Sequence, residues 1–595
     1  MNKTSHTDEP FEGDDGYNQS PNPNSNALTT NEDFNGLVNS RAALTGDSGA
    51  QADAASNVSG QIIGDAPVKT ADKAKAMYRL AHRSIDRGQP SYGGLQVNAP
   101  ANPAPAPTGG DADHDTPVQR LKKIFITVGS FIGPGFMVSV AYIDPGNYAT
   151  GIAAGASYRF RLLFIVMMSN IFAVFLQSLA IKLGTVSGLN LAQACRVFLP
   201  RWMNYTLYVF AEAAIIATDI AEVIGFAIAL NLLIPEIPLV AGCAISIIDV
   251  MVLLIFYRPE GSMKGLRYFE MFVMCLVLGV VVCFCIQLSL IRHTTPGEVF
   301  SGYLPSRPLI ESEAIYQACG ILGATVMPHS LYLGSGIVQP RLREYDERSA
   351  LLPNRLASGA SVADEGIDKG YYVPSERAIK HSLRLSILDL AISLFTFALF
   401  VNSAILIVAG ASLYNNSEAL EADIFGIHAL LSRSISPAAG TIFALALLLS
   451  GVSAGIICTI AGQMVSEGAL RWNIKPWLRR LVTRSISITP SIIIAGAVGR
   501  DGLNDALNGS QVALSIILPF VTAPLIYFTS CDKYMTVQNG SAQWRIAEGH
   551  DETTADEAVG QGVKMTNSWY TTTIAVLIWL FVAVMNVANL VFLGN

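Results

Sequence analysis

The chain has 595 residues, of which 51% are hydrophobic and only 14% are charged, and its formal net charge is -7. Soluble domains carry roughly 25% charged residues, so this composition, with a mean hydropathy of +0.40, excludes an ordinary soluble protein. The sequence also has no basic tract suited to nucleic acid. We therefore expect an integral membrane protein that lives in a lipid bilayer and has no nucleic-acid partner.

The amino-terminal part of the chain differs in composition from the rest. Residues 1–59 are rich in Asn, Asp, Ser and Gly, and residues 99–115 are rich in Pro, Ala and Gly. Neither run can bury enough apolar surface to fold. Apolar residues with helical spacing over 69–87 favour either a membrane-surface helix or a transient solvated one. The sequence predicts a disordered cytosolic tail over 1–118 and a membrane domain over 119–595.

Stretches of about 20 apolar residues, the length that crosses a bilayer as a helix, recur through the membrane domain. The eleven predicted spans are approximately 122–156, 162–183, 204–233, 238–257, 266–291, 313–339, 383–411, 440–464, 484–500, 510–530 and 570–592. Repeat one covers about 122–291, repeat two about 313–530, and the helix over about 570–592 is additional. This pattern predicts an all-α membrane protein with a 5+5 inverted repeat.

Lysine and arginine are concentrated in alternate connections between the spans. These basic positions are Lys122 and Lys123, Arg196 and Arg201, Arg258, Lys264 and Arg267, Arg341 to Arg384, and Arg471 to Arg480. Because cytoplasmic loops carry the excess of Lys and Arg, we expect these loops and the amino terminus in the cytosol and the carboxyl terminus on the outer or lumenal side. This orientation fits the plasma membrane and a vacuolar or endosomal membrane equally.

Glycosylation sequons give weak support to this orientation. Asn415 lies in a sequon in an expected outer loop and is a glycosylation candidate. Asn57 and Asn204 also lie in sequons, although both are expected on the inner side.

Two short interruptions lie inside hydrophobic segments where a membrane helix is normally continuous. Residues 144–147 read Asp-Pro-Gly-Asn in span one, and residues 327–330 read Met-Pro-His-Ser in span six. Proline removes a backbone hydrogen bond, and in hydrocarbon the freed carbonyls have no water to bind. Interrupted helices at corresponding places in two halves indicate the binding site of an inverted-repeat transporter. The carboxylate, carboxamide, thioether and imidazole beside these breaks favour a divalent metal ion as the substrate.

Each group at the breaks has an expected role and an alternative. Asp144 would supply negative charge and Asn147 a neutral oxygen, although either side chain could instead cap the second half-helix. Ala324 would offer its backbone carbonyl, because Pro328 has no amide to bond it. Met327 argues for a transition metal, since a thioether is a poor ligand for Ca²⁺ and Mg²⁺. Its alternative is a methionine that only packs in an apolar helix.

Proton movement requires side chains that change charge near the site. Asp219 and Glu222 are three residues apart in an apolar span, so they share one face of a helix. The alternative is a static buried ion pair. His329, directly after Pro328, either titrates or gates, or acts as a neutral hydrogen-bond donor, and both interpretations stay open.

Three stretches together resemble the Nramp family of proton-coupled divalent metal transporters, in its fungal or yeast-type form. They are 132–136 (IGPGF), 141–147 (AYIDPGN) and 323–329 (GATVMPH). A fourth stretch, 462–468 (GQMVSEG), resembles the family's loop motif after span eight. The resemblance covers about 120–530. It implies a LeuT-like bundle with broken helices 1 and 6 that rocks between outward-open and inward-open states.

The resemblance also implies residue roles. The implied metal ligands are Asp144, Asn147, Ala324 and Met327, with Gln511 reaching the metal in occluded states. For Gln511 the alternative is an interhelical hydrogen bond. The implied proton pathway contains Asp219 and Glu222, with Arg484 as the cationic partner. The sequence departs from many relatives at Ser330 and Gly334, where they carry asparagine and a second histidine, so a two-histidine relay is not expected.

The function expected from the sequence is movement of Mn²⁺ or Fe²⁺ into the cytosol, coupled to protons, by alternating access. The metal is the substrate, and no cofactor is expected. A sodium-coupled amino-acid carrier is an alternative, although Asp144 would repel the substrate carboxylate. A sensor that binds metal without carrying it is another alternative. Met327 disfavours a Mg²⁺ carrier, and an enzyme is not expected because no nucleophile, base and orienting group share a predicted pocket.

Overall fold

The computed structural model describes residues 133–248, 263–291, 294–307, 311–349, 351, 370–414, 424–434, 436–470, 476–537, 540, 542–546 and 562–593. All of them belong to one compact unit, 111–595. The predicted tail over 1–118, its helical patch over 69–87 and the sequon at Asn415 lie outside the described residues.

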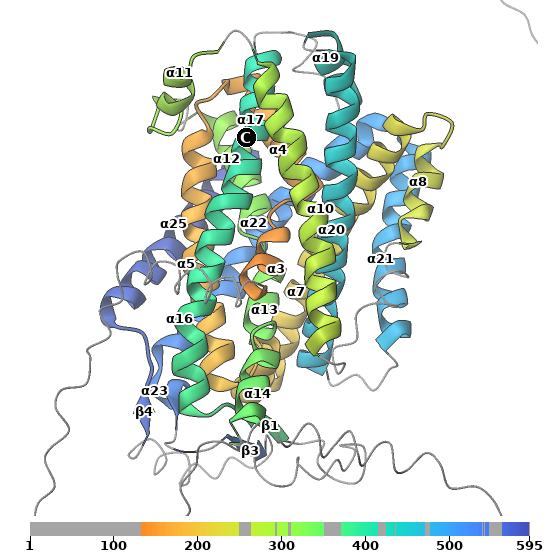
Figure 1. The fold of residues 1–595 in the computed structure, drawn as a ribbon. Helices are drawn as coiled ribbons and strands as arrows, with labels where there is room; N and C mark the ends of the chain where they lie inside the picture. Colours follow the sequence, from red (N-terminus) through yellow and green to blue (C-terminus); the bar gives the residue numbers. More distant parts are fainter. Residues whose placement is uncertain are drawn as a thin grey trace, which may run out of the picture. The chain divides into compact units, whose positions relative to one another are not determined.

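The described chain is almost entirely helical (Figure 1). Its first half contains α3 (Pro134–Val140), α4 (Pro145–Tyr158), α5 (Leu163–Ser187), α6 (Leu191–Phe198), α7 (Arg201–Leu233), α8 (Leu239–Ile245), α10 (Met263–Leu290) and α11 (Pro296–Ser301). The second half contains α12 (Ser312–Thr325), α13 (Pro328–Gly336), α14 (Gln339–Arg348), α16 (Glu376–Ser393), a π-helical turn (Leu394–Ala398), α17 (Leu399–Ser412), α19 (Ile424–Ser434), α20 (Pro437–Leu470), α21 (Pro476–Ala497), α22 (Arg500–Ser530), α23 (Asp532–Met535) and α25 (Trp569–Leu593).

Eight helices of the described chain are long and apolar enough to cross a membrane. They correspond to all of the predicted spans except the first, fourth and ninth. The first predicted span is divided into α3 and α4, and the fourth is described only as the short α8. The ninth span corresponds to α21, which has 22 residues but contains Arg479, Arg480 and Arg484 and is less apolar than the eight. The protein is therefore a helical multi-pass membrane protein with both predicted breaks, and the count of eleven spans stays a prediction.

The placement of the 462–468 motif in a loop is wrong. The sequence predicts a span that ends near 464, but α20 continues to Leu470, so the whole motif is helical. Arg196 donates hydrogen bonds to the carbonyls of Glu467 and Gly468 in the last turn. A cation at a helix carboxyl end binds the unpaired carbonyls there, which explains why the helix outlasts its apolar stretch.

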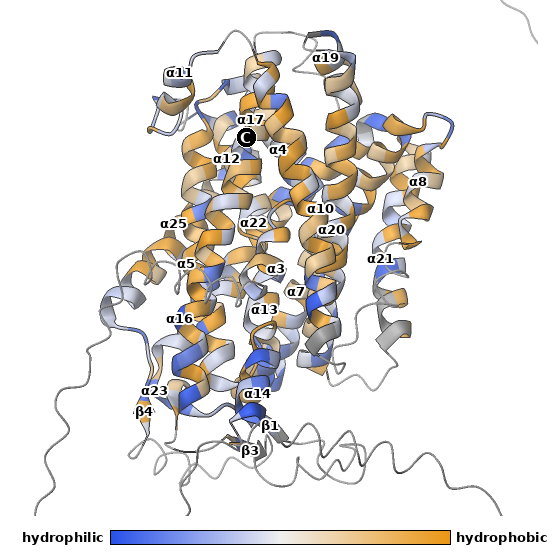
Figure 2. Ribbon diagram, viewed as in Figure 1, coloured by the Kyte–Doolittle hydropathy of each residue, from blue (hydrophilic) through white to orange (hydrophobic). Residues whose placement is uncertain are grey.

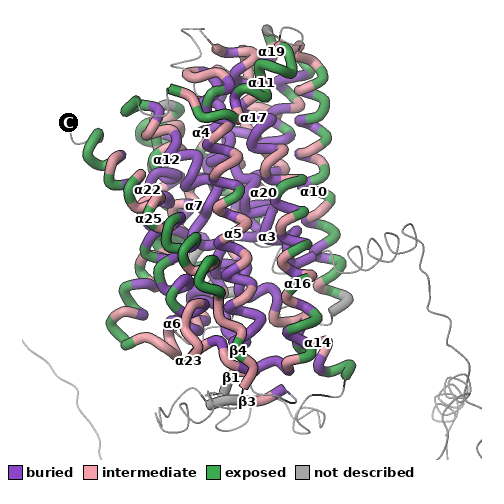
Figure 3. Tube along the Cα trace, turned by 90° about the vertical axis from the view of Figure 1, so that its left-hand side faces the viewer, coloured by how far each residue is buried: buried purple, intermediate pink, exposed green. Residues whose placement is uncertain are grey.

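Hydrophobic residues make up most of the peripheral helices (Figure 2), while the central helices are mostly buried (Figure 3). On α10 and α25 the large exposed apolar residues include Met271, Leu278, Val282, Leu577, Val584, Val587 and Leu590. A soluble protein rarely exposes so much contiguous apolar surface. Contact with lipid explains this exposed apolar surface, because the backbone hydrogen bonds of α10 and α25 are made within each helix and leave apolar side chains to face the bilayer.

Strands and polar contacts tie the loops at one end of the bundle, which Figure 1 places opposite α11 and α19. β1 (Gly370–Val373) pairs antiparallel with β3 (Gln543–Ile546), and β2 (Thr536–Val537) pairs with β4 (Val563–Lys564). The buried carboxylate of Asp346 accepts hydrogen bonds from the hydroxyl of Tyr372 and from the amide of Ser375, the latter at 2.9 Å. Burial, and then the bond to Asp346, raises the pKa of Tyr372, which keeps its hydroxyl a donor.

Glycines permit very close approach between helices. A Cβ added to Gly184 of α5 would stand 1.8 Å from the carbonyl oxygen of Ser335 in α13. The backbones of the two helices therefore meet directly, as small residues allow inside a membrane.

We expect Gly184→Ala to lower the free energy of unfolding by about 1–3 kcal/mol, because the new methyl group must push α5 and α13 apart. Thermal unfolding of the detergent-solubilised protein measures the effect. Gly509→Ala is the matched control, since a Cβ there meets nothing within 4 Å and alanine favours the helix by up to about 1 kcal/mol. Equal melting temperatures for the two variants would contradict the close packing.

Candidate metal site

The first helix break exposes a set of backbone carbonyls to side chains from other helices. α3 ends at Val140 and α4 begins at Pro145, so the residues between them lack regular helical bonds. The carbonyl of Tyr142 accepts from the Nδ2 atoms of Asn147 and Asn402, both at 3.1 Å, and the carbonyl of Ile143 accepts from Ser450 Oγ at 2.9 Å. These side chains replace the water that hydrocarbon does not supply.

Asp144 is the N-cap residue of α4, and it is completely buried. Its carboxylate accepts from the amide of Gly146 at 3.1 Å and from the amide of Asn147 at 3.2 Å. The capping role considered from the sequence is therefore present. The two capping bonds do not use all the acceptor capacity of the Asp144 carboxylate, because its two oxygens offer about four lone-pair sites. The cap instead fixes the direction of the remaining lone pairs and places the charge at the positive end of a half-helix.

Asn147 links the two broken helices. Its Nδ2 atom lies 2.6 Å from Oδ1 of Asp144 and 3.0 Å from the carbonyl oxygen of Ala324. Together with Tyr142, three oxygens thus converge on one polar hydrogen-bond donor. A convergence of a carboxylate and carbonyl oxygens is also what a divalent cation requires.

The second break contributes a free carbonyl and a thioether. α12 ends at Thr325 and α13 begins at Pro328, so the carbonyl of Ala324 has no amide partner in its own helix. Asn147 binds it instead. Met327 is the N-cap residue of α13, is completely buried and makes no capping hydrogen bond. The sulfur therefore stands three residues from the exposed carbonyl, inside the same interruption.

Gln511 of α22 lies directly against the first turn of α4. A Cβ added to Gly146 would stand 2.1 Å from its Nε2 and 2.8 Å from its Oε1. Nε2 donates to Ser510 Oγ at 3.0 Å, while Oε1 is buried and has no hydrogen-bond partner within the described part of the chain. A buried acceptor without a donor is costly, and a cation at the adjacent break would remove that cost.

Sequence reasoning missed a polar cluster that joins the two breaks from the side. Gln177 of α5 donates to the hydroxyl oxygens of Ser330 at 2.7 Å and Tyr142 at 3.0 Å. A Cβ on Gly334 would lie 2.1 Å from Gln177 Oε1. The available signal was the presence of Gln177 and Asn402 as uncharged polar residues inside predicted spans.

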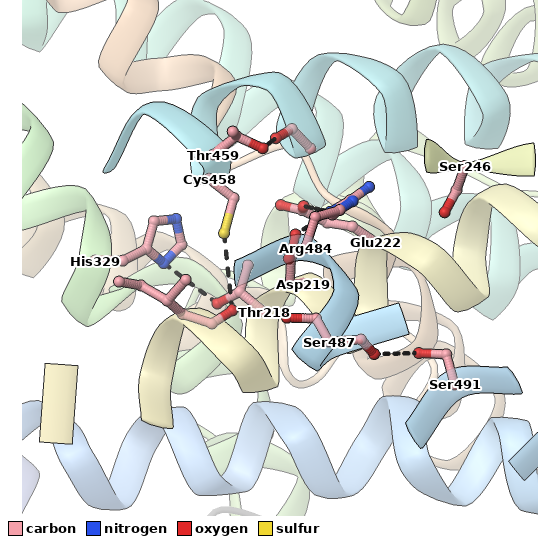
Figure 4. A network of polar contacts seen from close by, with 12 residues as sticks. Thr218, Asp219, Glu222, Ser246, His329, Cys458, Thr459, Arg484, Ser487 and Ser491 are labelled. Carbon is pink, nitrogen blue, oxygen red and sulfur yellow. Dashed lines mark hydrogen bonds and ion pairs between the residues drawn. The ribbon is translucent and has the colours of Figure 1, made fainter. Parts of the chain in front are cut away.

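Three of the predicted proton-pathway residues, Asp219 and Glu222 of α7 and Arg484 of α21, lie together (Figure 4). Arg484 forms an ion pair with Asp219 and a second one with Glu222, whose Oε2 lies 3.6 Å from Nη1. All three side chains are buried. Cys458 of α20, which sequence reasoning did not select, lies with its sulfur within 4.8 Å of both carboxylates. Two carboxylates thus share one guanidinium, and the group would carry one net negative charge if both acids were ionised.

His329 connects to this group through a neighbour rather than directly. Its Nδ1 atom lies 3.2 Å from Oγ1 of Thr218, the residue before Asp219 (Figure 4). The Thr218 hydroxyl donates to the carbonyl of Ala214 at 3.0 Å. Thr218 therefore has its single proton engaged, and the geometry favours His329 as the donor through Nδ1. Sequence reasoning gave no role to Thr218.

Comparisons with known proteins agree with this geometry. The yeast proteins named manganese transporter SMF1 and iron transporter SMF3, both from Saccharomyces cerevisiae, are 50% identical to this chain; the matches cover 80% and 79% of it, and 87% and 97% of those proteins. The divalent metal cation transporter MntH of Listeria monocytogenes is 40% identical over 71% of this chain and 87% of its own length.

Solved structures agree as well. A crystal structure of the Eremococcus coleocola manganese transporter, bound to an aromatic bis-isothiourea compound, superimposes with a TM-score of 0.62 at 30% identity, covering 78% of this chain and 86% of that one. Residues 135–547 match the family described as natural resistance-associated macrophage protein-like. This match contains both helix breaks, the acid pair and Gln511, and the chain belongs to the Nramp family.

Proposed function

We propose that this chain moves Mn²⁺ or Fe²⁺ into the cytosol together with protons, by alternating access, and that it is a transporter rather than a sensor. The observation that carries the proposal is the convergence of Asp144 Oδ1 and the Ala324 carbonyl on the Asn147 carboxamide. The relatives named for manganese, iron and divalent cation transport support the same class of substrate.

The metal would enter this site as substrate by replacing one hydrogen-bond donor. A cation among the three oxygens takes the place of the Asn147 amide hydrogens, and a half-turn of that carboxamide presents Oδ1 as a further ligand. Gln511 Oε1, buried without a partner beside Gly146, supports a fifth oxygen ligand. The thioether of Met327 completes a mixed oxygen and sulfur set, which suits transition metals better than Ca²⁺ or Mg²⁺.

Charge balance supports proton coupling at the group of Asp219, Glu222 and Arg484. Two carboxylates and one guanidinium buried together leave a net negative charge that hydrocarbon penalises by several kcal/mol. A proton on one acid neutralises the group while the other remains paired with Arg484. If the conformational change exposes this group first to one side of the membrane and then to the other, the bound proton crosses together with the metal.

Basic residues support an orientation for the molecule. The end that carries α14, β1 and the start of α16 (Figure 1) has several arginines and lysines, namely Arg341, Arg343, Arg348, Arg377, Lys380 and Arg384. By the positive-inside rule this end faces the cytosol. The plasma membrane and a vacuolar or endosomal membrane both fit, and Asn415 would then carry its glycan on the opposite side.

The first test is Asp144→Asn in proteoliposomes that hold the purified protein and an internal pH dye. In the wild type we expect Mn²⁺ to enter the vesicles and to acidify their interior. The variant should lose this entry, because its Mn²⁺ affinity falls at least ~100-fold when the Asp144 carboxylate is removed, a loss of about 2.8 kcal/mol of binding free energy. The exposed carboxylate of Asp505 in α22 provides the control variant Asp505→Asn. Binding of Mn²⁺ without flux would identify a sensor, and sodium-driven amino-acid uptake without Mn²⁺ flux would identify the other alternative.

Metal selectivity is tested at the thioether. We expect Met327→Ala to retain Mn²⁺ uptake and to admit Ca²⁺, because a site of oxygen ligands alone accepts hard cations. Tracer uptake of ⁴⁵Ca and of Mn²⁺ measures the ratio. Met137→Ala removes an equally buried methionine from α3 and should leave Ca²⁺ excluded. Continued exclusion of Ca²⁺ by Met327→Ala would refute the selectivity role.

Proton coupling is tested at Glu222. Wild-type Mn²⁺ uptake should accelerate as the outer pH is lowered from 7.5 to 5.5, because protons move inward with the metal. We expect Glu222→Gln, which cannot exchange a proton, to lose most of this acceleration and the internal acidification. Glu212→Gln is the control variant, because it alters another carboxyl group of α7, and the ion pairs found for Arg484 among the described residues join it to Asp219 and Glu222. This variant should keep the wild-type pH profile. An unchanged pH profile in Glu222→Gln would leave only the static ion pair.

A further inference from the structure

The tenth predicted span, α22, contains a proline whose helical partner is left unpaired. Pro519 has no amide hydrogen, so the carbonyl of Ser515, four residues earlier, loses its intrahelical bond. Asn586 of α25 replaces that bond, because its Nδ2 atom donates to the Ser515 carbonyl at 2.9 Å. Asn586 also donates to Val582 in its own helix at 2.9 Å, so both amide hydrogens are used.

Other contacts from α25 reach the same region. Nε1 of Trp579 donates to the carbonyl of Pro519 at 2.8 Å. The thiol of Cys319 in α12 lies 3.5 Å from the carbonyl oxygen of Met585 in α25. The last helix therefore contacts both α22 at its proline and the helix that leads into the second break.

The carbonyl bound by Asn586 ends the helical turn that begins at Gln511. Ser515 follows Gln511 by one helical turn. A Cβ on Gly323 of α12 would stand 2.0 Å from the carbonyl oxygen of Gln511 and 2.8 Å from the amide nitrogen of Ser515. α12 and α22 are thus in backbone contact here, directly before Ala324. A small shift of this turn would move Gln511 relative to Gly146.

We propose that Asn586 is a positioning residue for metal binding: by bonding the carbonyl that Pro519 frees, it fixes the turn of α22 that places Gln511 beside the first helix break. This inference rests on the proposed function, because it assumes that Gln511 contacts the metal. It gives α25, which the sequence treats as an addition to the two repeats, a part in substrate affinity. A helix that serves only as packing would change stability without changing the metal KM.

α25 offers a matched control one turn away. Asn589 is 1% exposed and Asn586 is 5% exposed, so both carboxamides are buried. Neither the Oδ1 nor the Nδ2 atom of Asn589 has a hydrogen-bond partner among the described residues. Replacing Asn589 by leucine therefore changes the same helix and the same kind of side chain without removing a bond to α22.

The experiment is a double-mutant cycle that compares the wild type, Asn586→Leu, Gln511→Ala and the double variant. For each protein the initial rate of Mn²⁺ uptake gives the KM, and calorimetry gives the Mn²⁺ affinity. We expect each single change to raise the Mn²⁺ KM by ~10-fold, the size seen when the support of a ligand is removed. The double variant should be no worse than Gln511→Ala, since residues that act through one another are not additive. Asn589→Leu should keep the wild-type KM.

Several results would overturn the inference. They are an unchanged KM in Asn586→Leu, an unchanged KM in Gln511→Ala, additive effects of ~100-fold in the double variant, and an equal rise in Asn589→Leu. If Asn586→Leu does not fold by size-exclusion and melting criteria, Asn586→Ser enters the cycle, because its short hydroxyl favours the carbonyl one turn earlier in its own helix. Wild-type protein without Mn²⁺ flux would instead refute the proposed function, so the two failures are distinct.

Discussion

A helix that is interrupted by proline inside a membrane leaves carbonyl oxygens that water cannot reach. In this protein, side-chain carboxamides and hydroxyls, most of them from other helices, donate hydrogen bonds to these carbonyls. Asn147 and Asn402 bind the Tyr142 carbonyl, Asn147 also binds the Ala324 carbonyl, and Asn586 binds the Ser515 carbonyl. The bonds of Asn147 also gather the oxygen atoms of Tyr142, Asp144 and Ala324 around one carboxamide. In the proposed site, a cation would take the place of the amide hydrogens there.

Charge is divided between two places in the bundle. The site between the breaks holds one carboxylate, Asp144, at the start of a half-helix, where the helix dipole supports it. The second place holds Asp219 and Glu222 around Arg484. Because these acids lie on α7 and their cation on α21, any relative movement of the two helices changes how well the negative charge is balanced. The two candidate sites therefore differ in the chemistry of their side chains and share a dependence on helix position.

The sequence predicted those features of the fold that depend on residues close together in the chain. Pro145 and Pro328 sit inside apolar runs, so both breaks and the candidate ligands beside them were predictable. Partners that reach across the bundle were not, because Gln177, Asn402 and Asn586 are polar residues in apolar spans whose targets depend on packing. Helix ends were also not predictable where a residue distant in the sequence binds the last turn, as Arg196 does at the end of α20. Three of the eleven predicted spans are not among the eight long apolar helices of the described chain, namely the first, which is divided into α3 and α4, the fourth and the ninth.

The contact between Gln177 and Gly334 limits which residue position 334 can hold. With only 2.1 Å between Gln177 Oε1 and a Cβ at position 334, a histidine cannot be accommodated there while the glutamine keeps its present conformation. A larger residue would displace the carboxamide that donates to Tyr142 and Ser330. The absence of a side chain at position 334 therefore keeps the polar cluster beside both helix breaks in place.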